Sequence, residues 1–531
     1  MHLGIDVGTQ GLSVVLTEAS SPYRVVAVGD GKPYAMVPDL DDECYEQRPD
    51  DWLVALRSAM EDLRAKLKST DGSLPSVGVE CALTKVESIG ISGQMHGEVL
   101  TDASGLAIAP ARIWCDGRNG DEGDQLTKLF GAKIPRRATV ARWLWTCRNR
   151  LDLAKHTKHM TTPAGYIAFH LTGAMNLGVG EAAGMFPIDQ STMSYNEEYL
   201  AKFDDCLRLG NLIDKVRPIR SILPRPRVAG QDGGSLTKSA SSSYLCDLVP
   251  PGIPVAPAEG DQVAALAGSL ISRPGQVSCS FGTSVCANSV GDRPFVGVSP
   301  AVDHFCAADG RPINMIWLQN GTTYMNAMVE MFGTVLPADD RRSEGFGAII
   351  PLLLSSPPDC GGLLALPFMD SEPGLGISSG GSAMLIGLSA ENATPGNAAK
   401  AALLGTMFNL RLGQEGLMEQ GYPRDELILS GGLTKTPELG QILADVFSAP
   451  VLLLDSAEEG TAWGAALMAA FRQRAVHGST ETWEVFLSNI DRGDVQRFYP
   501  DLKRAREYDQ VYKRYSRLVG TVPAVVEASG R

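Results

Sequence analysis

The chain has 531 residues, more than the roughly 250 to 300 that one hydrophobic core supports, so at least two domains are expected. Hydrophobic residues make up 44% and charged residues 20%, which is the composition of a globular protein rather than of a disordered chain or a fibre. The formal net charge of -14 argues against a nucleic-acid-binding surface, although helix ends and glycine loops can still bind anionic ligands.

The sequence gives no indication of secretion or of a membrane span. The first residues, MHLGIDVGTQG, carry an aspartate within their apolar stretch and have no basic leader, unlike a signal peptide. No apolar run approaches the roughly 18 residues of a membrane helix. The 10 cysteines are scattered without a CxxC pair, which favours reduced thiols and a cytoplasmic location. His156 and His159, in HTKH, have no neighbouring ligands, so we expect a solvated helix face there and no metal site.

The first elements in chain order form a three-stranded meander. Its strands are HLGIDVG, LSVVLTE and YRVVAVG, and the first two form a hairpin with a glycine-rich tip. Residues 49 to 69 repeat apolar side chains at helical spacing after an acidic first turn, which predicts a helix covering the sheet. A buried strand is expected at 86 to 92, and two more around an Asp-Ala-Ser-Gly turn in 97 to 114.

A turn follows the buried strand, in the stretch ISGQMHGEVL at residues 91 to 100. It places Met95 and His96 between two glycines, which let a backbone approach a ligand closely and adopt dihedral angles closed to other residues. These residues alone leave two interpretations open, a connecting turn with a surface histidine and a turn that contacts a ligand.

One segment in the second half of the chain is similar in sequence to a segment in the first half. Residues 278 to 290, SCSFGTSVCANSV, resemble residues 4 to 16, GIDVGTQGLSVVL, because each combines a strand, a Gly-Thr pair and a second strand. Such a repeat indicates two related domains that each offer a hairpin tip, with chance similarity as the alternative. A crossing at 269 to 275 would divide the chain into domains 1–272 and 273–531. The further elements expected are helices at 397–420, 438–448 and 501–519 and a strand at 426–432.

Three loops have the residue types that bind phosphate or nucleotide. Glycines leave backbone N–H groups uncovered, and Thr and Ser hydroxyls donate to phosphoryl oxygens. The first hairpin offers Gly8, Thr9, Gln10, Gly11 and Ser13, and Asp6 at its strand end can hold a hydrated Mg²⁺. This loop is neither a GxxxxGK[ST] loop nor a GxGxxG loop. In SGGLTKT, Gly431 and Gly432 would let a flat ring lie against the backbone.

Taken together, the motifs resemble those of the FGGY carbohydrate kinases. In chain order they are GIDVGTQGLSVVL, ISGQMHG, IWCDGR, AEGDQVAALAG, FGTSV, LSGGLTKTPELGQILADVFSAPV and EEGTAWGAALMA, and they span nearly the whole chain. The resemblance implies an α/β fold of two ribonuclease-H-like domains, as in actin, Hsp70 and hexokinase, around a central cleft. ATP would lie in the cleft, and the sugar deep against the N-terminal domain.

The resemblance also implies roles for single residues. The sugar is expected to contact Met95, His96, Trp114, Asp116, Arg137, Asp261 and Gln262. ATP is expected to contact Asp6, Gly8, Thr9, Gln10 and Ser13, the second hairpin at Gly282, Thr283 and Ser284, and the third loop at Gly431, Gly432 and Lys435. Asp6 would hold Mg²⁺ through water. A structural ion pair is an equal alternative for Asp116 and Arg118.

Asp261, in EGDQ, is expected to be the catalytic base. A carboxylate at a strand end can point into a cleft, and phosphoryl transfer requires a positioned hydroxyl. At an ordinary pKa of about 3.9 it would be ionised at neutral pH. The alternative role is an N-cap for the helix QVAALAGSL. Closure of the domains over the sugar would expel water and so limit ATP hydrolysis without sugar.

The turn Gln-Met-His-Gly is similar to that of the xylulokinases of this family, which makes D-xylulose the expected substrate and D-xylulose 5-phosphate the product. Three positions depart from that pattern: Gln262 follows Asp261, PAGY replaces Lys-Asp-Tyr, and Met331 replaces Trp. Sedoheptulokinases share Gly-Gln-Met-His-Gly, so a seven-carbon ketose is the nearest alternative, whereas glycerol kinases use Arg-Glu. An actin- or Hsp70-like ATP-binding protein and an inactive regulatory relative are alternatives of another class. The expected partners are sugar and ATP, without nucleic acid or membrane, and a homodimer is left open.

Overall fold

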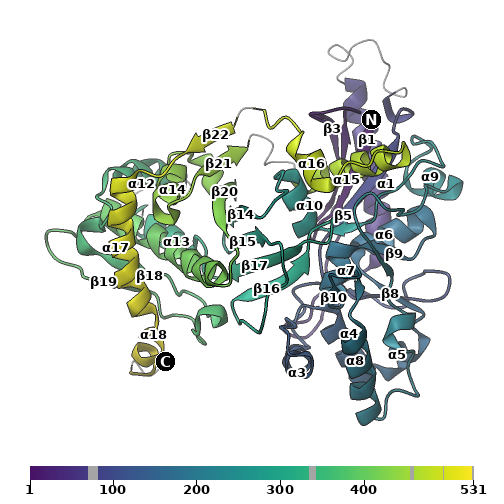
Figure 1. Ribbon diagram of the computed structural model, residues 1–531, viewed down its shortest axis with the longest axis horizontal. Coiled ribbons are helices and arrows are strands. Elements are labelled where there is room, and N and C mark those ends of the chain that lie inside the picture. Colours follow the sequence, from purple (N-terminus) through teal and green to yellow (C-terminus); the bar gives the residue numbers. More distant parts are fainter. Residues whose placement is uncertain (70–81, 334–342, 455–459, 494, 529–531) are drawn as a thin grey trace.

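The computed structural model describes residues 1–69, 82–333, 343–454, 460–493 and 495–528, which form two lobes (Figure 1). Each lobe contains a mixed sheet covered by helices. The first sheet has the order β13-β5-β1-β2-β3 and the second β16-β17-β15-β14-β20-β21-β22. The expected fold class, α/β with a sheet in each half, is therefore confirmed.

The elements of the first half lie between His2 and Gly268. The five strands of the first sheet are β1 (His2–Val7), β2 (Leu12–Thr17), β3 (Val25–Asp30), β5 (Ser88–Gly93) and β13 (Glu259–Gly260). The remaining strands are β4 (Glu46–Gln47), β6 (Val99–Thr101), β7 (Ala111–Arg112), β8 (His159–Thr161), β9 (Asn176–Gly178), β10 (Ile188–Asp189), β11 (Ser194–Tyr195) and β12 (Arg225–Arg227). The helices are α1 (Pro49–Ser69), α3 (Gly120–Phe130), α4 (Thr139–Asn149), α5 (Leu151–His156), α6 (Pro163–Thr172), α7 (Val179–Met185), α8 (Glu197–Leu209), η1 (Ile219–Ser221), α9 (Lys238–Tyr244) and α10 (Asp261–Gly268).

The elements of the second half begin at Gly275. Its strands are β14 (Gly275–Phe281), β15 (Val285–Val290), β16 (Val302–Cys306), β17 (Pro312–Leu318), β18 (Leu364–Leu366), β19 (Met384–Ile386), β20 (Arg424–Gly431), β21 (Val451–Leu454) and β22 (Val495–Phe498). Its helices are α11 (Thr323–Phe332), α12 (Ser343–Ser355), η3 (Cys360–Gly362), η4 (Pro373–Leu375), α13 (Pro395–Glu419), η5 (Gly432–Lys435), α14 (Leu439–Phe447), α15 (Gly460–Val476), α16 (Trp483–Ser488), α17 (Leu502–Val519) and α18 (Val522–Ala528).

The two sheets repeat one topology around their first hairpins. β1 and β2 pair antiparallel, as β14 and β15 do. β5 lies parallel to β1, and β20 lies parallel to β14 in the equivalent position. On the other side of each hairpin an antiparallel third strand follows, β3 in the first sheet and β17 in the second. The prediction that 4 to 16 and 278 to 290 form equivalent strand-turn-strand units is confirmed.

Helix α15 joins the lobes, because it follows β21 of the second sheet in sequence but packs on β1 and β5 of the first. A Cβ built on Gly4 would lie 2.0 Å from the carbonyl oxygen of Ala462, and one on Gly90 only 1.8 Å from that of Ala465. Only glycine therefore allows this approach of helix to sheet. The division into domains 1–272 and 273–531 stays a prediction.

The strongest periodic patterns located their elements well. The helix expected at 49 to 69 is α1, and its apolar stripe, Trp52, Leu56, Met60, Leu63 and Leu67, is fully buried. The helices expected at 397–420, 438–448 and 501–519 are α13, α14 and α17. The strand expected at 426–432 is β20, which ends one residue earlier, at Gly431.

Of two local predictions, one was wrong and one was confirmed. His156 and His159 do not share a helix face, because α5 ends at His156 and β8 begins at His159. The two strands expected in 97 to 114 form as β6 and β7 around the Asp-Ala-Ser-Gly turn. Antiparallel bridges at Glu98–Arg112 and Thr101–Ala107 pair the two segments with each other, and β6 and β7 also pair with β8 and β4.

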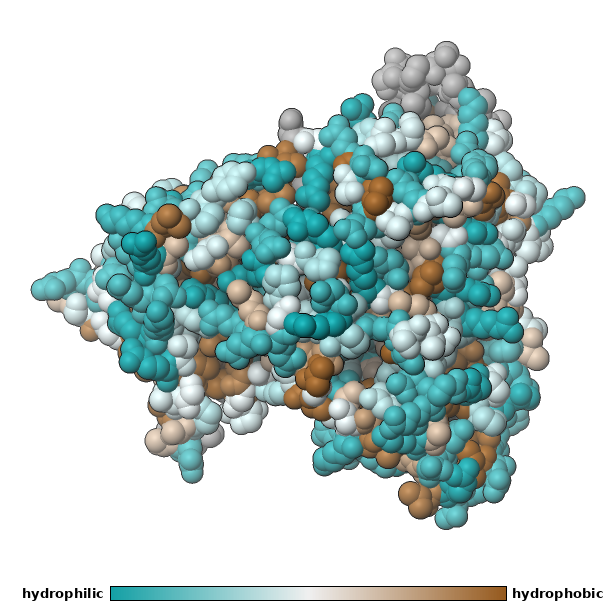
Figure 2. Space-filling view, in the orientation of Figure 1, coloured by the Kyte–Doolittle hydropathy of each residue, from teal (hydrophilic) through white to brown (hydrophobic). Residues whose placement is uncertain are grey.

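The surface and the thiols agree with the composition. In the view of Figure 2 the surface is largely hydrophilic, with small apolar patches and a notch between the lobes. Across the described ranges, no helix is long and apolar enough to cross a membrane. The 9 cysteines that the structure describes are free thiols, and no cluster of three or more His, Cys, Asp or Glu residues in the same ranges could hold a metal ion.

Candidate active site

Three of the predicted functional segments meet at one edge of the first sheet. β1, β5 and β13 are parallel, so their carboxyl ends share this edge. Asp6 lies near the end of β1, the Met95–His96 turn follows β5, and Asp261 follows β13. In open α/β sheets, ligands bind in the crevice beyond the carboxyl ends of the strands.

Asp261 is the first residue of α10, and its N-cap is Gly260. Asp261 is therefore not the N-cap of α10, which was the alternative role considered for it. The side chain is partly exposed, yet protein surrounds it closely, and burial together with the charge of Asp6 raises its pKa to about 7. The expectation of an ordinary pKa near 3.9 was wrong, because the carboxylate is enclosed by protein and a second carboxylate lies nearby.

Asp6 lies at this edge, and within the described part of the chain only one of its two carboxylate oxygens accepts a hydrogen bond. Burial raises the pKa of Asp6, while a hydrogen bond from Thr461 opposes the shift. Thr461 Oγ1 donates to Oδ2 over 2.7 Å, and buried Oδ1 has no hydrogen-bond partner among the described residues. A free carboxylate oxygen beside a second carboxylate fits a hydrated Mg²⁺, whose charge would relieve the repulsion between Asp6 and Asp261.

The tip of the first hairpin is tied to its surroundings by hydrogen bonds. The Gly8 amide donates to the carbonyl of Gly11 over 2.9 Å, which closes the turn. Thr9 accepts at its hydroxyl from Trp114 Nε1 over 3.0 Å and at its carbonyl from Gln47 Nε2 over 2.7 Å. These bonds hold the predicted phosphate loop against the segment that contains Trp114, whose side chain is 43% exposed.

Two further residues predicted to contact ATP lie on this hairpin. Gln10 is exposed at the tip, and Ser13 in β2 is the register partner of Asp6. Directly opposed residues of an antiparallel pair present their side chains on the same face. Ser13 and Asp6 therefore share one face of the sheet.

The tip of the second hairpin is hydrogen-bonded to residues at the start of α11. The Gly282 amide donates to the carbonyl of Ser284 over 2.9 Å. The hydroxyls of Thr322 and Thr323 donate to the carbonyls of Gly282 and Thr283 over 3.0 and 3.3 Å. These bonds occupy the carbonyls of the tip.

The third predicted loop lies beside the second hairpin. Gly431, the last residue of β20, pairs with Phe281 at the end of β14. Gly432 to Lys435 then form η5. The structure thus brings both predicted nucleotide loops of the second lobe to one edge of its sheet.

The Met95–His96 turn has the unusual geometry that its glycines suggested. His96 has a left-handed φ of 64°, and its Nδ1 lies 3.1 Å from the carbonyl oxygen of Gly184. Because a carbonyl only accepts, Nδ1 carries the proton. Burial, with the charge of Arg137, lowers the pKa of His96 to about 3, so the ring is neutral and Nε2 is an acceptor. Met95 packs against Gly260, where a Cβ would lie 2.3 Å from Met95 Cγ.

Arg142, in α4, was missed by the sequence analysis although it holds this turn. Its guanidinium is fully buried and donates to the carbonyls of His96 over 2.7 Å, Ile113 over 2.8 Å and Trp114 over 2.9 Å. A single buried arginine therefore joins the two segments expected to contact the sugar. A buried charge within the apolar run RWLWTC was the only local signal.

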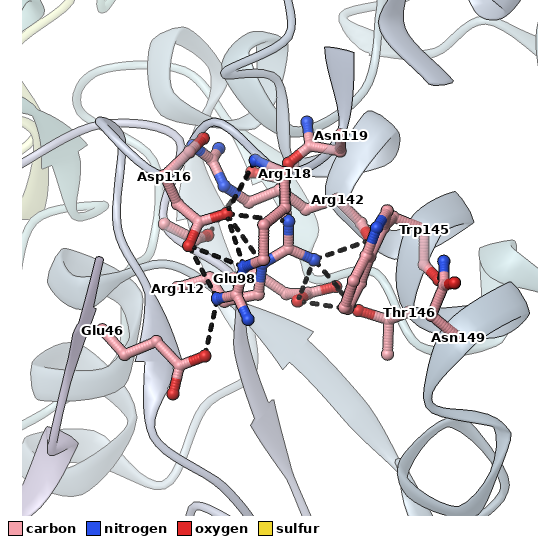
Figure 3. A network of polar contacts seen from close by, with 12 residues as sticks. Glu46, Glu98, Arg112, Asp116, Arg118, Asn119, Arg142, Trp145, Thr146 and Asn149 are labelled. Carbon is pink, nitrogen blue, oxygen red and sulfur yellow. Dashed lines mark hydrogen bonds and ion pairs between the residues drawn. The ribbon is translucent and has the colours of Figure 1, made fainter. Parts of the chain in front are cut away.

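Asp116 and Arg118 belong to a buried ionic network (Figure 3). Arg112 Nη2 lies 3.0 Å from Asp116 Oδ1, and Arg118 Nη2 lies 2.6 Å from Oδ2. Although burial alone would raise the pKa of Asp116, hydrogen bonds from Arg118 and the charge of Arg112 hold it below its ordinary value. Both carboxylate oxygens are thus occupied, as a structural ion pair requires.

Two predicted sugar contacts reach across to the second lobe. Arg137 forms an ion pair with Asp303 of β16. Gln262 accepts from Asn288 Nδ2 of β15 over 3.4 Å. In this arrangement both side chains link the lobes.

Glu181 of α7 is a second functional candidate that the sequence did not single out. It is fully buried, and neither carboxylate oxygen has a hydrogen-bond partner in the described part of the chain. A Cβ on Gly260 would lie 2.4 Å from Glu181 Oε2, which places this carboxyl directly behind Asp261. Burial raises the pKa of Glu181 well above its ordinary value.

Two sheets of one topology, each with a glycine hairpin, place the chain in the class of two-domain proteins with the ribonuclease-H-like fold. The chain belongs to the FGGY family of carbohydrate kinases: the N-terminal domain of the family matches residues 1–268 and the C-terminal domain matches residues 277–472. It is an ATP-dependent sugar kinase, and the family recognised from the motifs is confirmed.

Relatives over nearly the full length agree with this assignment. The xylulose kinase of Haemophilus influenzae is 23% identical over 527 residues, which cover 97% of this chain and 98% of the relative. The crystal structure of xylulose kinase from Rhodospirillum rubrum has a TM-score of 0.80 at 21% identity, covering 98% and 99% of the two chains. Plasmodium falciparum glycerol kinase with ADP has a TM-score of 0.76 at 17% identity and covers 98% of each chain. The fold is therefore shared by kinases of different names.

Proposed function

We propose that the chain transfers the γ-phosphoryl group of MgATP to a ketose, most specifically D-xylulose, with D-xylulose 5-phosphate as product and Asp261 as base. The observation that supports this proposal most is the meeting of Asp261, Asp6 and the Met95–His96 turn at one sheet edge. Domains 1–272 and 273–531 would bind the sugar and ATP respectively. A cytoplasmic location and a homodimer stay predictions.

In this proposal the sugar lies between the Met95–His96 turn and Asp261. His96 Nε2 accepts a hydrogen bond from a sugar hydroxyl, since its other nitrogen is committed to Gly184. Asp261 accepts the proton of the hydroxyl that attacks the γ-phosphorus, after first orienting it. Trp114 would line the pocket beside Thr9.

The nucleotide would lie between the two hairpins. Gly8 and Gly282 close the two turns, and the backbone amides of Thr9 and Gln10 and of Thr283 and Ser284 would bind the phosphates. Lys435 with Gly431 and Gly432 would lie beside the nucleoside. Asp6, through its free Oδ1, would hold Mg²⁺ by way of water. When bound, this ion supplies positive charge that neutralises phosphate oxygens.

D-xylulose is favoured because relatives matched over nearly the full length carry the name xylulose kinase. Their identity of 23% leaves room for another sugar. A seven-carbon ketose is the second candidate, because a cavity of about 310 Å³ continues past His96 between the lobes.

The test is ADP release with MgATP, coupled to NADH oxidation, across D-xylulose, sedoheptulose, D-ribulose, L-ribulose and glycerol. We expect the highest kcat/KM with D-xylulose and slow ATP hydrolysis without sugar. Another preferred ketose would replace the named substrate and leave the kinase assignment intact. Sugar-independent hydrolysis as fast as the sugar-dependent rate would contradict the proposal that closure over the sugar limits hydrolysis.

A further inference from the structure

A cavity of about 310 Å³ lies between the lobes and has His96 in its wall. The first lobe contributes His96, Lys133 and Gly184 to its walls, and the second contributes Phe295 and His304. Neither Asp261 nor the two glycine hairpins line it. The cavity is therefore a continuation of the sugar site rather than part of the nucleotide site.

His304, on β16, presents an unsatisfied acceptor to this cavity. Its Nδ1 lies 2.8 Å from Asn314 Oδ1, and an amide oxygen only accepts, so Nδ1 carries the proton. The ring stacks on Phe295 with centroids 4.6 Å apart and an interplanar angle of 27°. Nε2 is buried and has no hydrogen-bond partner among the described residues. A buried polar atom without a partner is costly, which indicates that a ligand satisfies it.

The two cations near the cavity share one carboxylate. Lys133 Nζ lies 2.8 Å from Asp303 Oδ1, and Arg137 pairs with the other oxygen of the same carboxylate. Two buried groups on residues that line the cavity have no hydrogen-bond partner among the described residues: His304 Nε2, an acceptor, and Asn314 Nδ2, a donor. A hydroxyl group can donate to the first and accept from the second, whereas a carboxylate or phosphate cannot donate.

The volume leaves room for a longer ligand. The cavity of about 310 Å³ is many times the roughly 10–15 Å³ that one water molecule requires, so it can hold a chain of several non-hydrogen atoms. A pentulose whose reacting hydroxyl lies at Asp261 and whose chain reaches His96 would leave this space to solvent. A longer sugar would extend into it.

We propose that this cavity binds the far end of ketoses longer than five carbons and that His304 determines the accepted chain length by accepting a hydrogen bond from a distal hydroxyl. The enzyme then phosphorylates heptuloses as well as pentuloses. This inference rests on the proposed ketose kinase activity. It assigns part of substrate recognition to the second lobe, so a long sugar would also favour closure of the lobes.

A pair of variants at His304 tests the role of Nε2. Asparagine can keep the hydrogen bond to Asn314 but is too short to reach the position of Nε2, whereas glutamine can place an amide oxygen there. We expect His304→Asn to lower kcat/KM for sedoheptulose about tenfold, the loss of roughly one hydrogen bond, and to leave kcat/KM for D-xylulose within about twofold. His304→Gln should retain more of the activity toward sedoheptulose.

The two sugars separate this inference from the proposed function. Wild-type turnover of D-xylulose without any turnover of sedoheptulose would overturn the inference and leave the ketose kinase intact. An equal loss for both sugars in His304→Asn would also overturn it, because it would indicate a general structural role. Absence of turnover with every ketose would refute the proposed function itself and the inference with it.

Discussion

Replacing Gly90 by alanine tests the contact that joins the lobes. Gly90 lies in β5 directly beneath α15, and an added Cβ would lie 1.8 Å from the carbonyl oxygen of Ala465. An ordinary contact begins at 3.4 Å, so helix and sheet must separate locally by about 1.6 Å. The neighbouring atom is helix backbone, which cannot rotate away as a side chain could.

The expected cost follows from the size of this overlap. Overpacking a core typically costs about 1–3 kcal/mol, and an overlap with backbone belongs at the upper end of that range. For a unit of about 250 residues each kcal/mol lowers Tm by about 2–4 °C, which predicts a fall of about 6–12 °C. Because α15 also brings Thr461 to Asp6, sugar-dependent ADP release should fall as well.

Thermal unfolding followed by circular dichroism measures this effect, with Gly416→Ala as the matched control. Gly416 lies in α13, and a Cβ there would meet nothing within 4 Å. Alanine at that helix position should stabilise by up to about 1 kcal/mol through helix propensity. An unchanged Tm in Gly90→Ala would refute the claim that the glycines of β1 and β5 exist to admit α15.

The other predictions concern the sugar pocket and the base. Arg142→Gln removes hydrogen bonds to the buried carbonyls of His96 and Trp114, so the KM for the sugar should rise at least tenfold while the KM for ATP changes little. Arg150→Gln is the control, because the Arg150 side chain forms an exposed ion pair, and it should change neither KM. Because burial and a neighbouring carboxylate raise the pKa of Asp261 to about 7, kcat/KM with both substrates far below saturation should fall about tenfold per pH unit below pH 7. A profile that is flat from pH 8 to pH 5 would show that Asp261 is not the base or that its site is not as enclosed as described.

Patterns that depend on one stretch of chain were predictable. α1 was located to the residue, because an acidic first turn and an unbroken apolar stripe determine a helix without reference to the rest of the fold. The two hairpins were found because each combines a strand, a Gly-Thr tip and a second strand. The segments of the site followed from the same motifs.

Features that depend on distant contacts were not predictable. The pKa of Asp261 is raised by burial and then by the charge of Asp6, which lies 255 positions away in sequence. Arg142, Glu181 and His304 acquire their roles only through burial beside segments with which they share no sequence pattern. From the sequence, Gly4 and Gly90 could be recognised only as parts of strands. Their role of allowing α15 to approach the sheet becomes visible only when the position of α15 is known.

The central claim is that Asp261 activates a sugar hydroxyl held at the edge of the first sheet, and single-turnover phosphoryl transfer tests it most directly. Enzyme in excess over γ-labelled ATP would be mixed with D-xylulose, and sugar phosphate would be measured for the wild type and for Asp261→Asn, with ATP affinity determined in parallel. The account predicts that transfer falls by about 10² to 10⁴ while ATP affinity changes little. Transfer within a few-fold of the wild-type rate in the variant would contradict it.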